Sequence, residues 1–296
     1  MVDLVGQHLG HYRLTHLLGR GGFADVYLGE QLYLGSQTAI KVLSAPLAPE
    51  ARAGFLAEAR TLVRLAHPRI IRLLDYGVQE QAPFLVMEYA PGGTLRKRHP
   101  KGERLPLAIV VEYVQQVAEA LQYAHSQRLI HRDVKPDNLL LGRHGEILLS
   151  DFGIALLAHS SRSQRTEDIV GTVSYMAPEQ LQGHPCQASD QYALGIMVYE
   201  WLSGTCPFSG SFVEIAAQHC LAVPPPLDPM RLGVPNAVAL MVSRALAKHP
   251  AQRFPSVLKF ARALEQAARL TRMKSAAPGS SRQWTLEDDF AGISTG

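Results

Sequence analysis

The sequence predicts an α+β fold in which a small β-rich lobe containing one helix is followed by a larger, mainly helical lobe. Short β-type runs dominate the N-terminal part of the chain and flank a cluster of glycines at 19–22. The pattern changes after the turn-forming segment Pro91-Gly92-Gly93, and the apolar periodicity beyond it is mainly that of helices. We therefore expect residues 10–270 to form one domain with two lobes.

The N-terminal lobe, expected at about 10–88, contains four β-type runs and one helix. The runs lie at 12–17, 25–30, 38–43 and 84–89. The helix is expected at 51–65. Its apolar residues recur at helical spacing, as Phe55, Leu62 and Leu65 do. Residues 88–93 are the expected linker between the two lobes.

The C-terminal lobe, expected at about 94–270, contains several helix-forming segments. In the clearest, 109–126, the apolar residues fall on one face of a helix. Further helices are expected at 188–203, 237–248 and 257–270. A β-hairpin is expected between them and the first helix, with strands at 139–141 and 147–149. Residues 271–296 have the composition of a flexible tail or linker.

Composition excludes several classes of function. The chain has 29 basic and 26 acidic residues, a net charge of +3, and its basic residues are scattered, which argues against a nucleic-acid-binding surface. Three widely spaced cysteines, Cys186, Cys206 and Cys220, form no CxxC pair, so we expect free thiols rather than a zinc site or disulfides. The start of the chain lacks a signal-peptide pattern, and no apolar run is long enough for a membrane helix. We expect a cytoplasmic protein with no membrane segment in this chain.

The glycine cluster Gly19-Arg20-Gly21-Gly22 joins two β-type runs. Glycines at such a turn let backbone amides approach a polyphosphate without obstruction by Cβ atoms. A dinucleotide-binding loop would lead into a helix, whereas this one leads into a strand. The pattern favours a flap over a nucleotide, although glycine-rich strand turns are common without any ligand.

Lys41 lies inside an apolar strand, where an unpaired ammonium group is costly. Alternation along the strand places Ile40 and Val42 on one face and Lys41 on the other. Glu58 shares the apolar stripe of the helix at 51–65 and also needs a counter-charge. We therefore expect Lys41 and Glu58 to pair. The plainer alternative is an edge-strand lysine that opposes aggregation.

The most specific segment is His131-Arg132-Asp133-Val134-Lys135-Pro136-Asp137-Asn138, which Asp151-Phe152-Gly153 follows. The predicted hairpin between them should bring Asn138 and Asp151 close together. Both side chains offer hard oxygen ligands, which suit a magnesium ion held between protein and phosphate. Isolated Asp and Asn residues in loops are usually turn formers, but so many motif residues in fixed order make that explanation weak.

Taken together, these motifs resemble those of the eukaryotic-type (Hanks-type) serine/threonine protein kinases, and most closely their bacterial members. The resemblance covers residues 10–270 and implies a bilobal protein-kinase fold. It also implies transfer of the γ-phosphoryl group of ATP to serine or threonine hydroxyls of proteins, with Mg²⁺ as cofactor. Signal transduction through phosphorylation is the implied role. Autophosphorylation would require self-association of two copies.

By this resemblance, the backbone of 19–23 covers the ATP phosphates, and Lys41 holds the α- and β-phosphates. Three side chains sandwich the adenine ring, Met87 is the gatekeeper, and the backbone of Glu88 and Ala90 binds the adenine edge. The implied ATP-binding set is Leu18, Gly19, Arg20, Gly21, Gly22, Phe23, Val26, Ala39, Lys41, Met87, Glu88, Ala90 and Leu140.

The resemblance also assigns the catalytic roles. Asp133 orients the acceptor hydroxyl and accepts its proton, and Lys135 stabilises charge on the transferring phosphoryl group. Lys41 acts while paired with Glu58. Asn138 and Asp151 are the implied metal ligands. Because an aspartate of ordinary pKa is a weak base for an alcohol, positioning is expected to matter more than proton abstraction.

Further positions follow from the same resemblance. The segment 171–179 matches the peptide-binding segment, Glu179 is expected to pair with Arg253, and Asp190 to brace the catalytic loop. Thr166 is the expected phosphorylation site of the activation loop, with Arg132 as the anchor of its phosphate. Four residues match the regulatory spine: Leu62, Leu73, His131 and Phe152.

Three positions depart from the usual pattern. Ala24 replaces the third loop glycine, Thr94 stands where many relatives have an acidic residue near the ribose, and Leu156 stands where many have a basic residue that binds the loop phosphate.

Two other functions fit the sequence less well. A pseudokinase typically lacks Lys41, Asp133 or Asp151, and a small-molecule kinase lacks a segment like 171–179. Lys135 disfavours a tyrosine kinase.

Overall fold

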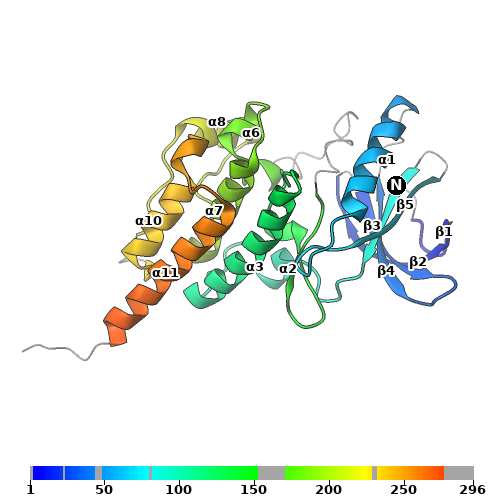
Figure 1. Cartoon of the computed structure of the whole chain (residues 1–296), viewed down its shortest axis with the longest axis horizontal. Helices are drawn as coiled ribbons and strands as arrows, with labels where there is room; N and C mark the ends of the chain where they lie inside the picture. Colours follow the sequence, from blue (N-terminus) through cyan, green and yellow to red (C-terminus); the bar gives the residue numbers. More distant parts are fainter. Residues whose placement is uncertain are drawn as a thin grey trace, which may run out of the picture.

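The protein has an N-terminal β-sheet region and a helical C-terminal region (Figure 1), so the predicted two-lobed α+β architecture is confirmed. The computed structural model describes residues 3–22, 24–43, 49–79, 82–152, 171–228 and 232–276. No helix within these ranges is long and apolar enough to cross a membrane.

Six antiparallel strands form the N-terminal sheet, in the order β1-β2-β3-β4-β6-β5. Four of them lie close to the predicted runs, whereas β1 and β5 were not predicted. Leu73 is the one residue of β5 with less than a tenth of its surface exposed. This strand therefore lacks the alternating apolar pattern that marks the others. The bounds are β1 His8–Leu9, β2 Tyr12–Arg20, β3 Ala24–Gln31, β4 Gln37–Leu43, β5 Leu73–Gln79 and β6 Ala82–Glu88.

The two faces of β4 contribute to different cores, as strand alternation predicts. Ile40 and Val42 are buried in a cluster confined to the N-terminal lobe. Ala39 and Leu43 face the other way, into the main core, where helix α1 (Pro49–Val63) contributes Phe55. Lys41 shares this second face because its side chain alternates with those of its two neighbours. The lysine is thereby aimed toward the rest of the site.

The C-terminal lobe is built around α7 (Gln187–Ser203), in which every residue from 189 to 202 is buried. Helix α3 (Leu107–Ser126) packs against both α7 and α11 (Val257–Ala276), and α10 (Asn236–Ala245) packs against the same two helices (Figure 1). Shorter elements complete the lobe: α2 Leu95–Arg98, η1 Pro136–Asn138, α6 Pro178–Leu181, α8 Phe212–Leu221 and η2 Pro250–Gln252.

Several helices differ from the sequence prediction, among them the short α2 and α6, which were not predicted. Helix α8 was not predicted, because only Ile215 and His219 of its residues are buried. Helix α11 continues to Ala276, whereas a flexible tail was expected from 271. The remainder of that expected tail, 277–296, lies outside the described residues.

A short hairpin, β7 (Leu139–Leu141) and β8 (Ile147–Leu149), connects the two lobes. The Leu149 amide donates to the Arg69 carbonyl at 2.8 Å, and the Ile71 amide donates to the Leu149 carbonyl at 2.9 Å. On the other strand, the amides of Gly92 and Leu141 donate to Leu141 and Gly93 carbonyls at 3.0 and 2.8 Å. The hairpin therefore holds the linker on one side and the N-terminal lobe on the other.

Candidate active site

Asp190 fixes the backbone at the start of the catalytic loop. Its buried carboxylate accepts the amide protons of His131 and Arg132 at 2.9 and 2.8 Å. It also contacts His125 Nε2 at 2.7 Å. Arg132 has a φ of 68°, a left-handed conformation that is strained for a residue with a side chain. The two hydrogen bonds that Asp190 accepts help to hold that conformation.

His131 links the catalytic loop to the segment that contains Asp151. Its Nδ1 atom accepts the Asp133 amide proton at 3.2 Å, so the ring proton is on Nε2, which donates to the Ser150 carbonyl at 2.7 Å. The His131 ring lies 4.6 Å from that of Phe152. Both residues are buried, as are the other two members of the expected spine, Leu62 and Leu73.

The Asp133 carboxylate is held by two neighbours in the same loop. Its Oδ2 atom accepts from Asn138 Nδ2 at 2.9 Å and lies 2.9 Å from Lys135 Nζ. Lys135 Nζ also donates to the Thr172 hydroxyl at 2.9 Å. A carboxylate, an ammonium group and the start of the 171–179 segment are thus brought together.

Asp151 adopts the left-handed conformation, with a φ of 63°, and meets the lysine of the N-terminal lobe. Lys41 Nζ lies 2.7 Å from Asp151 Oδ1. Burial alone would raise the pKa of Asp151, but the ammonium group of Lys41 outweighs it and holds the pKa below its ordinary value. Asp151 is therefore ionised at neutral pH.

Asn138 and Asp151 are brought together through Ser150. The amide and the hydroxyl of Ser150 both donate to the Asn138 carbonyl, at 2.9 and 3.0 Å. Because the side-chain nitrogen of Asn138 binds Asp133, its side-chain oxygen is directed away from that carboxylate. Oδ2 of Asp151 is not the atom that contacts Lys41. These two oxygens suit a hard cation such as Mg²⁺.

The donor set accounts for only part of a metal coordination shell. No cluster of three or more His, Cys, Asp or Glu residues is present in the described ranges. Magnesium commonly keeps several waters and completes its shell with substrate phosphates, so two protein oxygens fit a metal that arrives with a nucleotide. They do not fit a closed structural metal site.

The strand ends that flank the glycine turn between β2 and β3 are in register with Lys41 on β4. Gly19 pairs with Val26, and Val26 pairs with Lys41 on β4. The Gly21 amide donates to the Ala24 carbonyl at 2.9 Å, and a Cβ atom at Gly21 would lie 3.3 Å from that oxygen. The tight turn therefore favours glycine at this position.

The remaining residues of the expected nucleotide site border the linker. Ala39, Met87 and Ala90 are buried, Leu140 is half-buried, and Glu88 is exposed. Thr94 caps α2, since its hydroxyl accepts from the Lys97 amide at 3.1 Å. Leu18 and Arg20 extend β2 up to the glycine turn, and Gly22 follows it.

The side chains of three expected site residues are not described. Phe23 and Thr166 lie outside the described ranges, and only the backbone of Glu58, within α1, is described. The expected pairing of Lys41 with Glu58 thus remains a prediction. The described partner of Lys41 is Asp151.

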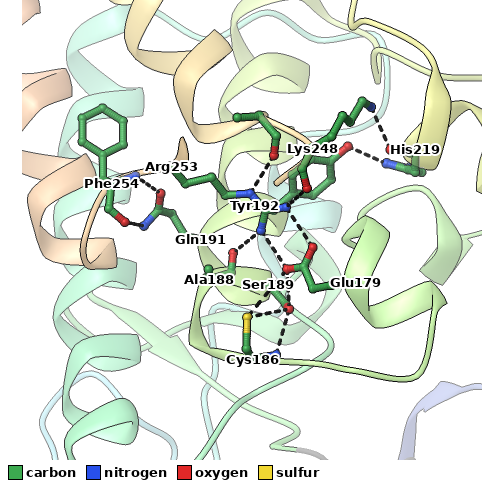
Figure 2. A network of polar contacts seen from close by, with 11 residues as sticks. Glu179, Cys186, Ala188, Ser189, Gln191, Tyr192, His219, Lys248, Arg253 and Phe254 are labelled. Carbon is green, nitrogen blue, oxygen red and sulfur yellow. Dashed lines mark hydrogen bonds and ion pairs between the residues drawn. The ribbon is translucent and has the colours of Figure 1, made fainter. Parts of the chain in front are cut away.

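Glu179 and Arg253 form a buried, bidentate ion pair (Figure 2). Arg253 Nη1 and Nη2 each donate to one oxygen of Glu179 at 2.8 Å. The same guanidinium group donates to the carbonyls of Ala188, Ala247 and Lys248, so Arg253 connects α6 to α7 and to the segment that follows α10. Burial raises the pKa of Glu179, but hydrogen bonds from Arg253 and Ser189 lower it below its ordinary value.

A second buried ion pair, which was not predicted from the sequence, lies beside the catalytic loop. Arg96 of α2 binds Glu200 of α7, which is 3% exposed. Glu200 lies in the apolar run 192–202, and a carboxylate in such a run needs a partner. That signal could have been found, but the identity of the partner depends on the fold.

Comparison with known proteins agrees with this geometry. A family model described as protein kinase domain matches residues 12–263. The kinase Pkn1 of Myxococcus xanthus is 40% identical over 274 residues, which cover 89% of this chain and 39% of that protein. PrkC of Bacillus subtilis is 35% identical over 85% of this chain and 40% of its own length.

A third relative is matched over a larger share of its own length. PknA of Mycobacterium tuberculosis is 38% identical over 264 residues, which cover 86% of this chain and 61% of that protein. All three are named serine/threonine-protein kinases. The chain therefore spans about two fifths to three fifths of the length of these curated relatives.

Proposed function

This chain belongs to the protein kinase domain family, and we propose that it is a serine/threonine protein kinase that transfers the γ-phosphoryl group of ATP to proteins. Members of the family use ATP with a divalent metal ion. The observation that carries the proposal is the position of Asp133 between Lys135 and Asn138, next to Asp151 and its partner Lys41.

The arrangement supports a single in-line transfer. The acceptor hydroxyl oxygen attacks the γ-phosphorus, the bond from that phosphorus to the β,γ-bridging oxygen breaks, and ADP leaves. The hydroxyl proton passes to the carboxylate of Asp133. Because Lys135 Nζ lies 2.9 Å from that carboxylate, its positive charge is close to where charge on the phosphoryl group develops.

Asp133 acts mainly by positioning. Its carboxylate accepts a hydrogen bond from Asn138 and contacts the ammonium group of Lys135, and these two neighbours fix its orientation. Holding the hydroxyl in line with the phosphorus supplies most of the advantage. The Lys135–Thr172 hydrogen bond places segment 171–179 beside this point, which supports a polypeptide acceptor.

We further propose that Mg²⁺ is the metal and that Asn138 and Asp151 hold it. Bound there, the ion would neutralise charge on the β- and γ-phosphates. Lys41, paired with Glu58 in the active state, would hold the α- and β-phosphates while remaining close to Asp151. The backbone of 19–23 would cover the phosphates. Val26, Ala39 and Leu140 would contact adenine, next to Met87 and the backbone of Glu88 and Ala90.

The protein as a whole is proposed to act in the cytoplasm on protein substrates and on its own activation loop. The names of the three bacterial relatives support the class of substrate. Trans-phosphorylation of Thr166 would require transient self-association.

Two substitutions test the proposal. Asp133→Asn and Asp151→Asn should each lower phosphoryl transfer by at least two to three orders of magnitude, or about 3–4 kcal/mol of barrier. Asp151→Asn should also weaken Mg-dependent ATP binding, measured by calorimetry, whereas Asp133→Asn should not. If both variants transferred phosphate at the wild-type rate, the proposed site would be wrong.

A further inference from the structure

The side chain of Arg96 joins four separate parts of the C-terminal lobe. Its Nη1 and Nη2 atoms donate to the two carboxylate oxygens of Glu200 in α7, at 2.9 and 3.1 Å. Nη2 also donates to the hydroxyl of Tyr175, which donates in turn to Glu200 at 2.6 Å. Nε lies 3.7 Å from Asp137 Oδ2 in η1. One guanidinium group thus connects α2, α7, η1 and the segment before α6.

Arg96, Glu200 and Tyr175 form the shielded part of this cluster, whereas Asp137 is exposed. Glu200 and Tyr175 are 3% and 4% exposed, and the Arg96 side chain is 15% exposed. Burial raises the pKa of the Tyr175 hydroxyl, so it stays protonated. Burial lowers the pKa of Arg96, but hydrogen bonding to Glu200 and the nearby charges outweigh this and raise the pKa above its ordinary value. Arg96 therefore stays charged. A buried charge that loses its partner is costly, so each group restrains the others.

The two ends of the cluster lead to two residues of the proposed acceptor site, Lys135 and Asp133. Tyr175 lies three residues after Thr172, whose hydroxyl accepts from Lys135. Asp137 directly precedes Asn138, whose amide donates to Asp133. Arg96 is therefore connected through Tyr175 to the segment that contacts Lys135, and through Asp137 to the loop that holds Asp133.

One donor in the cluster is left unused. Arg96 Nε is buried and has no hydrogen-bond partner within the described part of the chain. Its 3.7 Å separation from Asp137 Oδ2 is an ion-pair distance rather than a hydrogen bond. The connection to the catalytic loop is thus the looser one, whereas the connections to Tyr175 and Glu200 are tight.

We propose that Arg96 is a positioning residue for the protein acceptor: it fixes the spacing between the catalytic loop and segment 171–177. The inference rests on the proposed kinase function. Arg96 touches neither reacting group, and it acts through Tyr175 and Asp137. Its loss should weaken binding of the protein acceptor rather than of ATP, because the nucleotide residues Lys41 and Asp151 lie outside the cluster.

Arg96→Lys is the first test. Lysine keeps the charge but lacks the planar fork that binds both Glu200 oxygens and Tyr175 together. With myelin basic protein as acceptor, we expect KM for the acceptor to rise at least fivefold and KM for ATP to stay within twofold. Arg98→Lys, on the exposed side of the same helix, is the matched control and should change neither constant.

Tyr175→Phe is the second test, because it removes one hydroxyl and leaves the Arg96–Glu200 pair in place. It should also raise KM for the acceptor, and the double variant should be no worse than the more affected single one. This variant keeps the inference testable if Arg96→Lys does not fold, as judged by its melting temperature.

The outcomes separate positioning from simple stabilisation. An unchanged acceptor KM in both variants, with only the melting temperature lowered, would show that the cluster is merely structural. An equal rise in KM for ATP, or an additive double variant, would also overturn the inference. Failure of the wild-type protein to phosphorylate any protein would instead refute the proposed function.

Discussion

Single residues at the site carry backbone strain as well as charge. Among the described residues, Arg132 and Asp151 are two of three non-glycine residues with positive φ, at 68° and 63°. Such conformations cost about 1–3 kcal/mol each, and the surrounding structure must maintain them. Asp190 does so for Arg132, and Lys41 binds the side chain of Asp151. His131 joins the two segments that contain these residues, because it directly precedes Arg132 and bonds the carbonyl of Ser150, which directly precedes Asp151.

The buried pair of Glu179 and Arg253 gives a stability prediction at this scale. Arg253→Ala leaves the carboxylate without its partner, at a cost of about 3–5 kcal/mol. Since domains of this kind have about 5–15 kcal/mol of stability, the melting temperature should fall sharply. Thermal denaturation of both proteins measures the change. Arg262→Ala, exposed on α11, is the control and should have little effect.

The pH dependence of the same variant gives a second check. In the wild type the pKa of Glu179 is lowered, so its stabilising contribution is present above the unfolded pKa of about 4.3 and is lost as pH falls through the folded value. Without Arg253, the largest remaining influence on that pKa is burial, which raises it. The gap in melting temperature should therefore be larger at pH 7 than at pH 5. A constant gap would mean that Glu179 does not carry the effect.

At the scale of elements, the contact between the linker and β7 sets the geometry near the proposed adenine site. A Cβ atom at Gly92 would lie 2.6 Å from Leu141 Cβ and 2.7 Å from its carbonyl oxygen. Gly92→Ala should displace β7 at a cost of about 1–3 kcal/mol. Because Leu140 lies on that strand, KM for ATP should rise several-fold in steady-state kinetics.

Gly93→Ala separates this clash from backbone strain. Gly93 has a φ of +72°, but an added Cβ atom would meet nothing within 4 Å. The substitution should lower the melting temperature slightly and leave the ATP KM close to that of the wild type. If the two variants had the same ATP KM, the close approach of Gly92 to Leu141 would not control nucleotide binding.

At the scale of the whole molecule, we expect a phosphate on Thr166 to order the catalytic site through Arg132. The backbone of Arg132 is fixed at both its polar groups. Its amide donates to Asp190, and its carbonyl accepts from the Gln180 side chain at 2.6 Å. The Arg132 side chain therefore projects from a rigid point. A charge-assisted contact would shift the population five- to about a hundred-fold, or about 1–3 kcal/mol.

Thr166→Ala should therefore lower the rate on an added protein substrate at least fivefold. Arg132→Ala should have the same effect, and the two should not be additive. Mass spectrometry of the wild type after incubation with ATP should find the phosphate on Thr166. A Thr166→Ala variant as active as the wild type would show that the site is ordered without phosphate, in line with the missing basic residue at Leu156.

Local pattern in the sequence predicted most of the longer elements and indicated the candidate residues for the chemistry. Alternation along 38–43 correctly separated Ile40 from Lys41, since each strand residue reverses its face. Periodicity located the helix at 109–126, because most of its apolar residues face one core. Strand β5 and helix α8 were missed because few of their residues are buried, which leaves no periodic signal.

Apart from Glu179 and Arg253, whose pairing the family resemblance implied, only the tertiary structure decided which charges meet. Lys41 and Asp151 are 110 residues apart in sequence, and Arg96 and Glu200 are 104 apart. The sequence by itself shows that a buried charge needs a partner, because leaving it unpaired in an apolar environment is costly. It does not show which partner, since several groups of the right sign are available and their distances depend on how the lobes and helices pack.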